Sequence, residues 1–137
     1  MTLFSHAGMR PAIGGDRAFL YAAAAFNLVA VALVVLLTRV EPAWLGLDPP
    51  SASQQFYADL SALLIGGFGW AYALGARDLP RFWPFIAMGA ACKAGVAVLA
   101  LAYYLAGHVG TLVLLLATCD AVFAVLFVRL LRRHALG

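Results

Sequence analysis

Residues 82–106 read FWPFIAMGAACKAGVAVLALAYYLA, an apolar run of 25 residues in which Lys93 is the only charged side chain. A helix needs about 20 apolar residues to cross the hydrocarbon core of a bilayer, which is about 30 Å thick. The run is continuous rather than alternating and is rich in Ala and Leu, which disfavours a strand of a β-barrel. It therefore predicts a transmembrane helix.

Three further runs of similar length lie elsewhere in the chain. Residues 18–38 carry no charge, residues 56–76 carry Asp59 alone, and residues 109–128 carry Asp120 alone. The residues outside these four spans are too few for a domain outside the membrane. We therefore expect an all-α fold, in which residues 1–137 form a single transmembrane four-helix bundle with short loops.

The composition excludes several classes of protein. Hydrophobic residues make up 65% of the chain and charged residues 11%, against about 25% charged in soluble domains. The mean hydropathy is +0.95. A soluble enzyme, a nucleic-acid-binding domain and a secreted disulfide scaffold all fit these values poorly. We expect membrane lipid, and no nucleic acid, among the partners.

The distribution of Lys and Arg beside the spans predicts the orientation. Seven arginines lie on one side and Arg39 alone on the other, and the seven are Arg10, Arg17, Arg77, Arg81, Arg129, Arg132 and Arg133. Cytoplasmic loops carry an excess of basic residues, so both termini are expected in the cytoplasm. Small multidrug-resistance transporters are similar in size and number of spans, but their dual topology needs nearly balanced charge. The preference for Arg over Lys and the abundance of Ala indicate a bacterial inner membrane.

Local signals predict where three of the helices begin. Ser51 and Gln54 have the spacing of a capping box, which opens the second helix directly after two prolines. Asp16 and Asp78 are expected to cap the first and third helices.

Three charged side chains and one asparagine fall inside the spans. At 1.5 Å per residue, Asn27, Lys93 and Asp120 all lie roughly 14–16 Å from an end of their helices, which places them near the midplane. Asp59 lies closer to the outer surface, roughly 9 Å above Lys93. We expect these residues to form one polar cluster, which Asp59 extends outward.

This cluster has two competing interpretations. An ionisable residue inside a membrane indicates a functional site by default, so the cluster would bind or transport a small or lipidic molecule. Alternatively, Lys93 and Asp120 form an ion pair that only fixes helix packing, in a structural or accessory subunit of a larger membrane complex. A less favoured third class is an intramembrane enzyme that uses Lys93 or Asp120 as its acid–base group. The chain carries no recognisable catalytic motif, and no cofactor or metal is expected.

Small residues form stripes on two of the predicted helices, where they allow helix backbones to approach closely. The members are Ala62, Gly66, Gly69 and Ala73 on the second, and Ala87, Ala91 and Gly95 on the third. We expect packing within the chain, while a face for self-association and a groove lined for a ligand remain as alternatives.

The second span also carries Trp70 and Tyr72, and the third and fourth spans carry Cys92 and Cys119. Trp70 and Tyr72 are expected to anchor the protein at the membrane interface. Cys92 and Cys119 are expected to be buried as small apolar groups.

Overall fold

The structure is a computed structural model, in which residues 10–135 are described. It consists of four long helices and one short 3₁₀ helix: α1 (Gly15–Val40), η2 (Pro42–Leu45), α2 (Ala52–Arg77), α3 (Leu79–Leu105) and α4 (Thr111–Ala135). All four long helices have the length and apolar composition needed to cross a membrane. The expectation of an all-helical fold is thus confirmed. The helix α4 continues beyond the predicted span and includes the arginines near the C-terminus.

Two of the three predicted helix starts are confirmed. The Ser51 hydroxyl accepts a hydrogen bond from the Gln54 backbone, and the Gln54 side chain accepts one from the Ser51 backbone at 2.8 Å. Asp78 accepts a hydrogen bond from the Arg81 backbone at 3.2 Å and is the one residue between α2 and α3. The prediction for Asp16 is wrong. Gly14 occupies the cap position, and Asp16 lies in the first turn, where its carboxylate binds side chains of α4.

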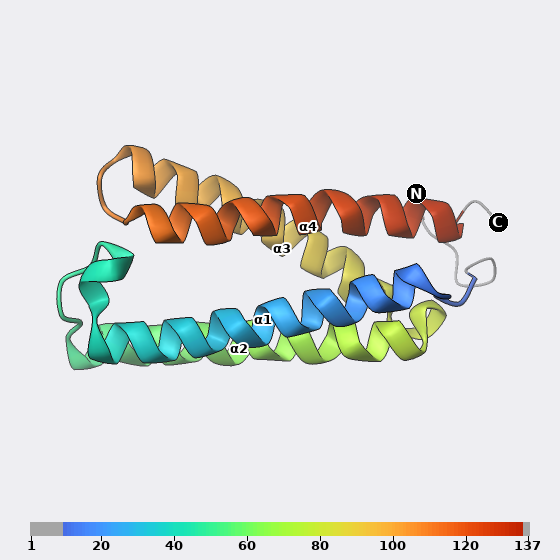
Figure 1. Ribbon diagram of the computed structural model, residues 1–137, viewed down its shortest axis with the longest axis horizontal. Coiled ribbons are helices and arrows are strands. Elements are labelled where there is room, and N and C mark those ends of the chain that lie inside the picture. Colours follow the sequence, from blue (N-terminus) through green and yellow to red (C-terminus); the bar gives the residue numbers. More distant parts are fainter. Residues whose placement is uncertain (1–9, 136–137) are drawn as a thin grey trace.

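The helices form two hairpins (Figure 1). The first pairs α1 with α2, which run side by side, and the second pairs α3 with α4. The helix α3 starts beside the end of α2 and crosses obliquely, so that it ends beside the start of α4. Both described chain ends lie at one end of the bundle, which we call the terminal end. The opposite end, which holds η2 and the turn between α3 and α4, is called the η2 end.

The tightest core lies in the terminal half of the bundle. Tyr72, Ile86 and Phe127 come from three different helices, and each has at most 1% of its surface exposed. The outer surface is covered by large apolar side chains, and Leu63 and Leu105 are more than 70% exposed. A soluble protein rarely exposes such continuous apolar surface, whereas lipid tails cover it readily. The four helices are therefore consistent with a multi-pass membrane protein.

The small residues of α2 lie against α1. A Cβ atom at Gly69 would lie 3.1 Å from the Asn27 Cβ and 3.3 Å from the Ala24 carbonyl oxygen, so α1 would have to move by a few tenths of an ångström to accept a larger residue. Gly66 faces Val31 at 3.7 Å, where a side chain would make an ordinary contact. Along the same helix, Ala62 is buried and Ala73 is partly buried against the core.

The small residues of α3 are placed differently. Ala87 packs against the core, but Ala91 is exposed, and a Cβ atom at Gly95 would meet no other atom within 4 Å. The structure therefore does not place Ala91 and Gly95 in a close contact within the chain. Their face of α3 points outward, because the face of α3 that packs into the bundle carries two other alanines, Ala90 and Ala100.

The two hairpins touch at the η2 end through backbone atoms. The Gly110 amide donates a hydrogen bond to the Leu45 carbonyl oxygen at 2.7 Å. Gly46 follows η2 with a φ of 72°, and a Cβ atom there would lie 2.7 Å from the Gly110 Cα. This close approach requires glycine, since other residues rarely adopt this φ and would collide with the facing backbone.

Polar side chains join the hairpins at the terminal end. Arg133 donates a hydrogen bond to Asp16 at 2.7 Å, and the His134 Nε2 lies 2.9 Å from the second oxygen of the same carboxylate. The His134 Nδ1 lies 3.0 Å from the Arg10 carbonyl oxygen. Each ring nitrogen of His134 thus faces an oxygen atom, one from the Asp16 side chain and one from the Arg10 backbone. These contacts hold the end of α4 against the start of α1.

Candidate functional site

The ammonium group of Lys93 lies at the centre of the bundle, where 6% of the residue is exposed. It donates hydrogen bonds to Asn27 Oδ1 at 3.0 Å and to Asp120 Oδ1, with which it forms an ion pair. The Asn27 side chain also donates to the Ile65 carbonyl oxygen at 2.9 Å. The structure therefore brings three of the four sequence-selected residues together, and their contacts involve all four long helices.

Three aromatic rings surround the same ammonium group. The Lys93 Nζ lies 5.1 Å from the ring centre of Phe26, 5.5 Å from that of Phe123 and 5.9 Å from that of Tyr72. The faces of aromatic rings attract cations at such distances, and the attraction is stronger where water is excluded. The rings thus stabilise a positive charge at a position where water does not.

Tyr72 is not the interface anchor that the sequence suggested. It is 1% exposed, and its ring packs between α3 and α4, with its centre 4.8 Å from that of Phe127. Gly89 makes this position available, because a Cβ atom there would lie 2.7 Å from Tyr72 Cε1. Trp70, on the other face of α2, is 68% exposed.

A cavity of about 290 Å³ adjoins the polar cluster. Its wall includes Asn27, Lys93 and Asp120, and the Asp120 side chain is 19% exposed. The rim is formed by exposed residues of α2 and α3, among them Leu64 and Val96, so the cavity opens sideways between these helices. We call it the Lys93 cleft.

The cysteines differ from expectation. Both are exposed rather than buried, because Cys92 of α3 and Cys119 of α4 lie on outward faces of their helices. Cys92 lines the Lys93 cleft.

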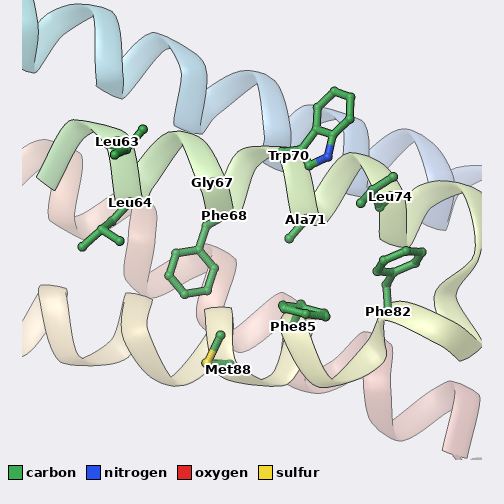
Figure 2. A pocket seen from close by; sticks show the side chains of 10 residues that line it. All are labelled: Leu63, Leu64, Gly67, Phe68, Trp70, Ala71, Leu74, Phe82, Phe85 and Met88. Carbon is green, nitrogen blue, oxygen red and sulfur yellow. The ribbon is translucent and has the colours of Figure 1, made fainter. Parts of the chain in front are cut away.

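An apolar groove lies next to the cleft, between α2 and α3. It encloses about 390 Å³ and shares Leu64 and Phe68 with the wall of the Lys93 cleft. Figure 2 shows Phe68 of α2 and Phe85 and Met88 of α3 pointing into the space between the two helices. All of its lining residues are apolar. We call it the α2–α3 groove.

Asp59 is not part of the cluster. Both of its carboxylate oxygens accept hydrogen bonds from Arg39 at 2.8 Å, and one also accepts from Gln55 at 3.1 Å. The side chains of Arg39 and Asp59 are 45% and 44% exposed. Arg39 lies at the end of α1 and reaches this carboxylate more readily than Lys93 does. Asp59 thus links α1 to α2 near the η2 end and does not extend the cluster outward.

The aromatic surroundings of Lys93 were not predicted from the sequence. Phe26 precedes Asn27, and Phe123 follows Asp120 by three residues, a spacing that puts two residues on one face of a helix. That spacing could have identified Phe123. Nothing in the sequence could have identified Gly89, because its role depends on the angle at which α3 crosses Tyr72.

Comparison with protein-family models, curated proteins and solved structures finds no match to this chain.

Proposed function

We propose that this protein binds or transports a small amphipathic or lipidic molecule in a membrane. The polar group of the ligand would contact Lys93 and Asp120 in the cleft, and its apolar part would occupy the α2–α3 groove. The observation that carries the proposal is that the two spaces are neighbours, because Leu64 and Phe68 line both of them. A polar pocket beside an apolar groove matches the two parts of such a molecule.

The incomplete burial of Asp120 supports this function. An ion pair that served only to hold helices would be stabilised by tight packing on every side, since a buried pair gains little unless its remaining hydrogen-bonding positions are satisfied. Here Asp120 borders open space and makes one hydrogen bond, to Lys93, among the contacts of residues 10–135. Its second oxygen is available to a ligand donor.

The alternative function is that of a structural or accessory subunit. It is favoured by the environment of Lys93, whose ammonium group has two oxygen partners and three aromatic neighbours. A cation with so many partners needs no ligand. The two functions differ in whether the cleft is occupied when the protein is isolated from its membrane.

The setting that we propose is a bacterial inner membrane, with both termini in the cytoplasm. The arginines that support this orientation lie at the terminal end of the bundle, and Arg39 lies at the η2 end. Ligand would then reach the cleft from within the bilayer, through the opening between α2 and α3.

Native mass spectrometry of the purified protein tests the proposal. We expect a co-purifying small molecule or lipid on the unmodified protein. The charge exchange Lys93→Asp with Asp120→Lys should abolish its retention, because the polar group of the ligand would meet the wrong charge on each wall. A second variant, Leu64→Trp, should also abolish retention by filling the junction of cleft and groove while leaving the ion pair intact.

Matched controls separate lost binding from lost folding. Leu28 on α1 and Leu64 on α2 are both 60% exposed, and Leu28 does not line the cleft, so Leu28→Trp should retain the ligand. Exchanging Arg39 and Asp59 should also leave retention unchanged. If no species is bound to the unmodified protein, and the charge exchange is equally stable, the binding function is rejected in favour of the accessory subunit.

A further inference from the structure

A second groove lies between α3 and α4 in the terminal half of the bundle. It encloses about 630 Å³ and is lined mainly by alanines of α3, including Ala91 and Ala94, and by Val125 and Val128 of α4. The lining of α3 extends from Ala87 to Ala94, which corresponds to about 10 Å along the helix axis. The groove exists because alanine side chains are too short to fill the space between the helices.

Two arginines close this groove at the terminal end. Arg129 and Arg132 are exposed and belong to its lining. The ion pairs among residues 10–135 are Arg39–Asp59, Lys93–Asp120, and those of Asp16 with Arg133 and His134, so neither Arg129 nor Arg132 has an acidic partner. The alanine-lined groove thus ends at two arginines that have no acidic partner among residues 10–135.

The same two arginines also border another hollow. This space, of about 540 Å³, is lined on its apolar side by Phe19 and Leu126, and its polar wall includes Arg133 and the Asp16 carboxylate. Arg129 and Arg132 therefore line two neighbouring spaces, each of which also has apolar lining residues. A glycerophospholipid has matching parts, a phosphate that carries two acyl chains.

We propose that this surface binds an anionic phospholipid of the surrounding bilayer. The phosphate contacts Arg129 and Arg132, and one acyl chain lies along the alanine-lined groove. Arginine binds phosphate through several donors at once, and basic pockets between transmembrane helices bind anionic headgroups. The long arginine side chains reach the headgroup level while their stems cover apolar surface. This site is separate from the Lys93 cleft and does not depend on the function proposed for it.

Lipid retention in native mass spectrometry tests the site, with phosphatidylglycerol and phosphatidylcholine added separately to the detergent-purified protein. We expect stronger retention of phosphatidylglycerol. Each arginine contributes about a fivefold change in affinity for an anionic lipid, so Arg129→Ala with Arg132→Ala should weaken binding about 25-fold. Ala91→Leu should weaken retention of the same lipid by filling the groove, and it should fold because Ala91 is exposed.

Two controls make the outcome decisive. Arg77→Ala with Arg81→Ala removes the same charge outside the groove, and Ala102→Leu adds the same bulk at an exposed position on the opposite half of α3. Both should retain phosphatidylglycerol as the unmodified protein does. Equal losses in the Arg129/Arg132 and Arg77/Arg81 pairs would overturn the proposal. A dimer that Ala91→Leu dissociates would also overturn it, because the groove would then be a contact between two copies.

Discussion

At the scale of single residues, the central feature is a lysine buried inside an apolar bundle. The Lys93 ammonium group contacts an asparagine, an aspartate and three aromatic rings, which take the place of water. Removing one member of a buried ion pair leaves the other charge without compensation, at a cost of about 3–5 kcal/mol. The loss of either partner alone should therefore lower the free energy of unfolding, and the loss of both should lower it by less than the sum of the two single losses.

We expect Lys93→Ala and Asp120→Ala each to lower the free energy of unfolding in detergent by about 3–5 kcal/mol. The double variant should lose less than the sum, with a coupling energy of about 0.5–3 kcal/mol, because no unpaired charge remains. The same cycle at Arg39 and Asp59 serves as the control. That pair is exposed, so its coupling should be at most about 1 kcal/mol. Additive effects at Lys93 and Asp120 would show that their contact contributes nothing to stability.

The sequence could predict which residues form the polar cluster around Lys93, but it could not show that Asp59 lies outside this cluster. Helix rise alone places Asn27, Lys93 and Asp120 at one depth, and burial favours their pairing, so their contact follows from elementary geometry. Asp59 was misassigned because depth along a helix does not say which way a side chain points. The nearer cation was Arg39, which lies at the end of the adjacent helix.

At the scale of helices, the small residues of α2 and α3 differ in what they contact. Gly69 allows α2 to lie against α1, and Gly89 allows Tyr72 to lie against α3, while Gly95 faces open space. The presence of small residues was visible in the sequence. Which of them meet a neighbour depends on the rotation and crossing angle of each helix, and packing in three dimensions decides both.

This difference can be measured on α3 alone. Gly89→Ala should lower the free energy of unfolding by about 1–3 kcal/mol, because the new methyl group overlaps the Tyr72 ring. Gly95→Ala should be neutral or stabilising by up to about 1 kcal/mol, since alanine favours the helix and meets no atom. Tyr72→Phe should recover part of the Gly89→Ala loss by removing the hydroxyl. Equal effects at the two glycines would contradict the position of Tyr72.

At the scale of the whole molecule, the four helices and their order follow from hydrophobicity, and the structure contains them all. The pairing of α3 with α4 follows from the short connection of residues 106–110, whereas the shortest connection, the single residue Asp78, joins one hairpin to the other. The oblique course of α3 could not be read from the sequence, because it results from how the hairpins pack together. The Lys93 cleft and both grooves depend on that course.

Orientation is tested by single cysteines in a variant that lacks Cys92 and Cys119. A cysteine at Ser53 should react with a membrane-impermeant maleimide added to intact spheroplasts. Cysteines at Arg81 and Ala135 should react only after the membrane is opened, because the arginine-rich end faces the cytoplasm. Labelling of all three positions in intact spheroplasts would indicate insertion in both orientations.

The contacts that join the hairpins at both ends determine how the molecule can deform. If the hairpins rocked about the terminal end, the Gly110–Leu45 hydrogen bond at the η2 end would break. If they rocked about the η2 end, the contacts of Asp16 with Arg133 and His134 would break. Outward bowing of α2 and α3 at mid-length breaks neither. We therefore expect the proposed ligand to exchange between the Lys93 cleft and the bilayer interior, and we do not expect the cleft to open alternately to water on the two sides of the membrane. Such a protein would extract and return molecules within the membrane, with no aqueous pathway across it.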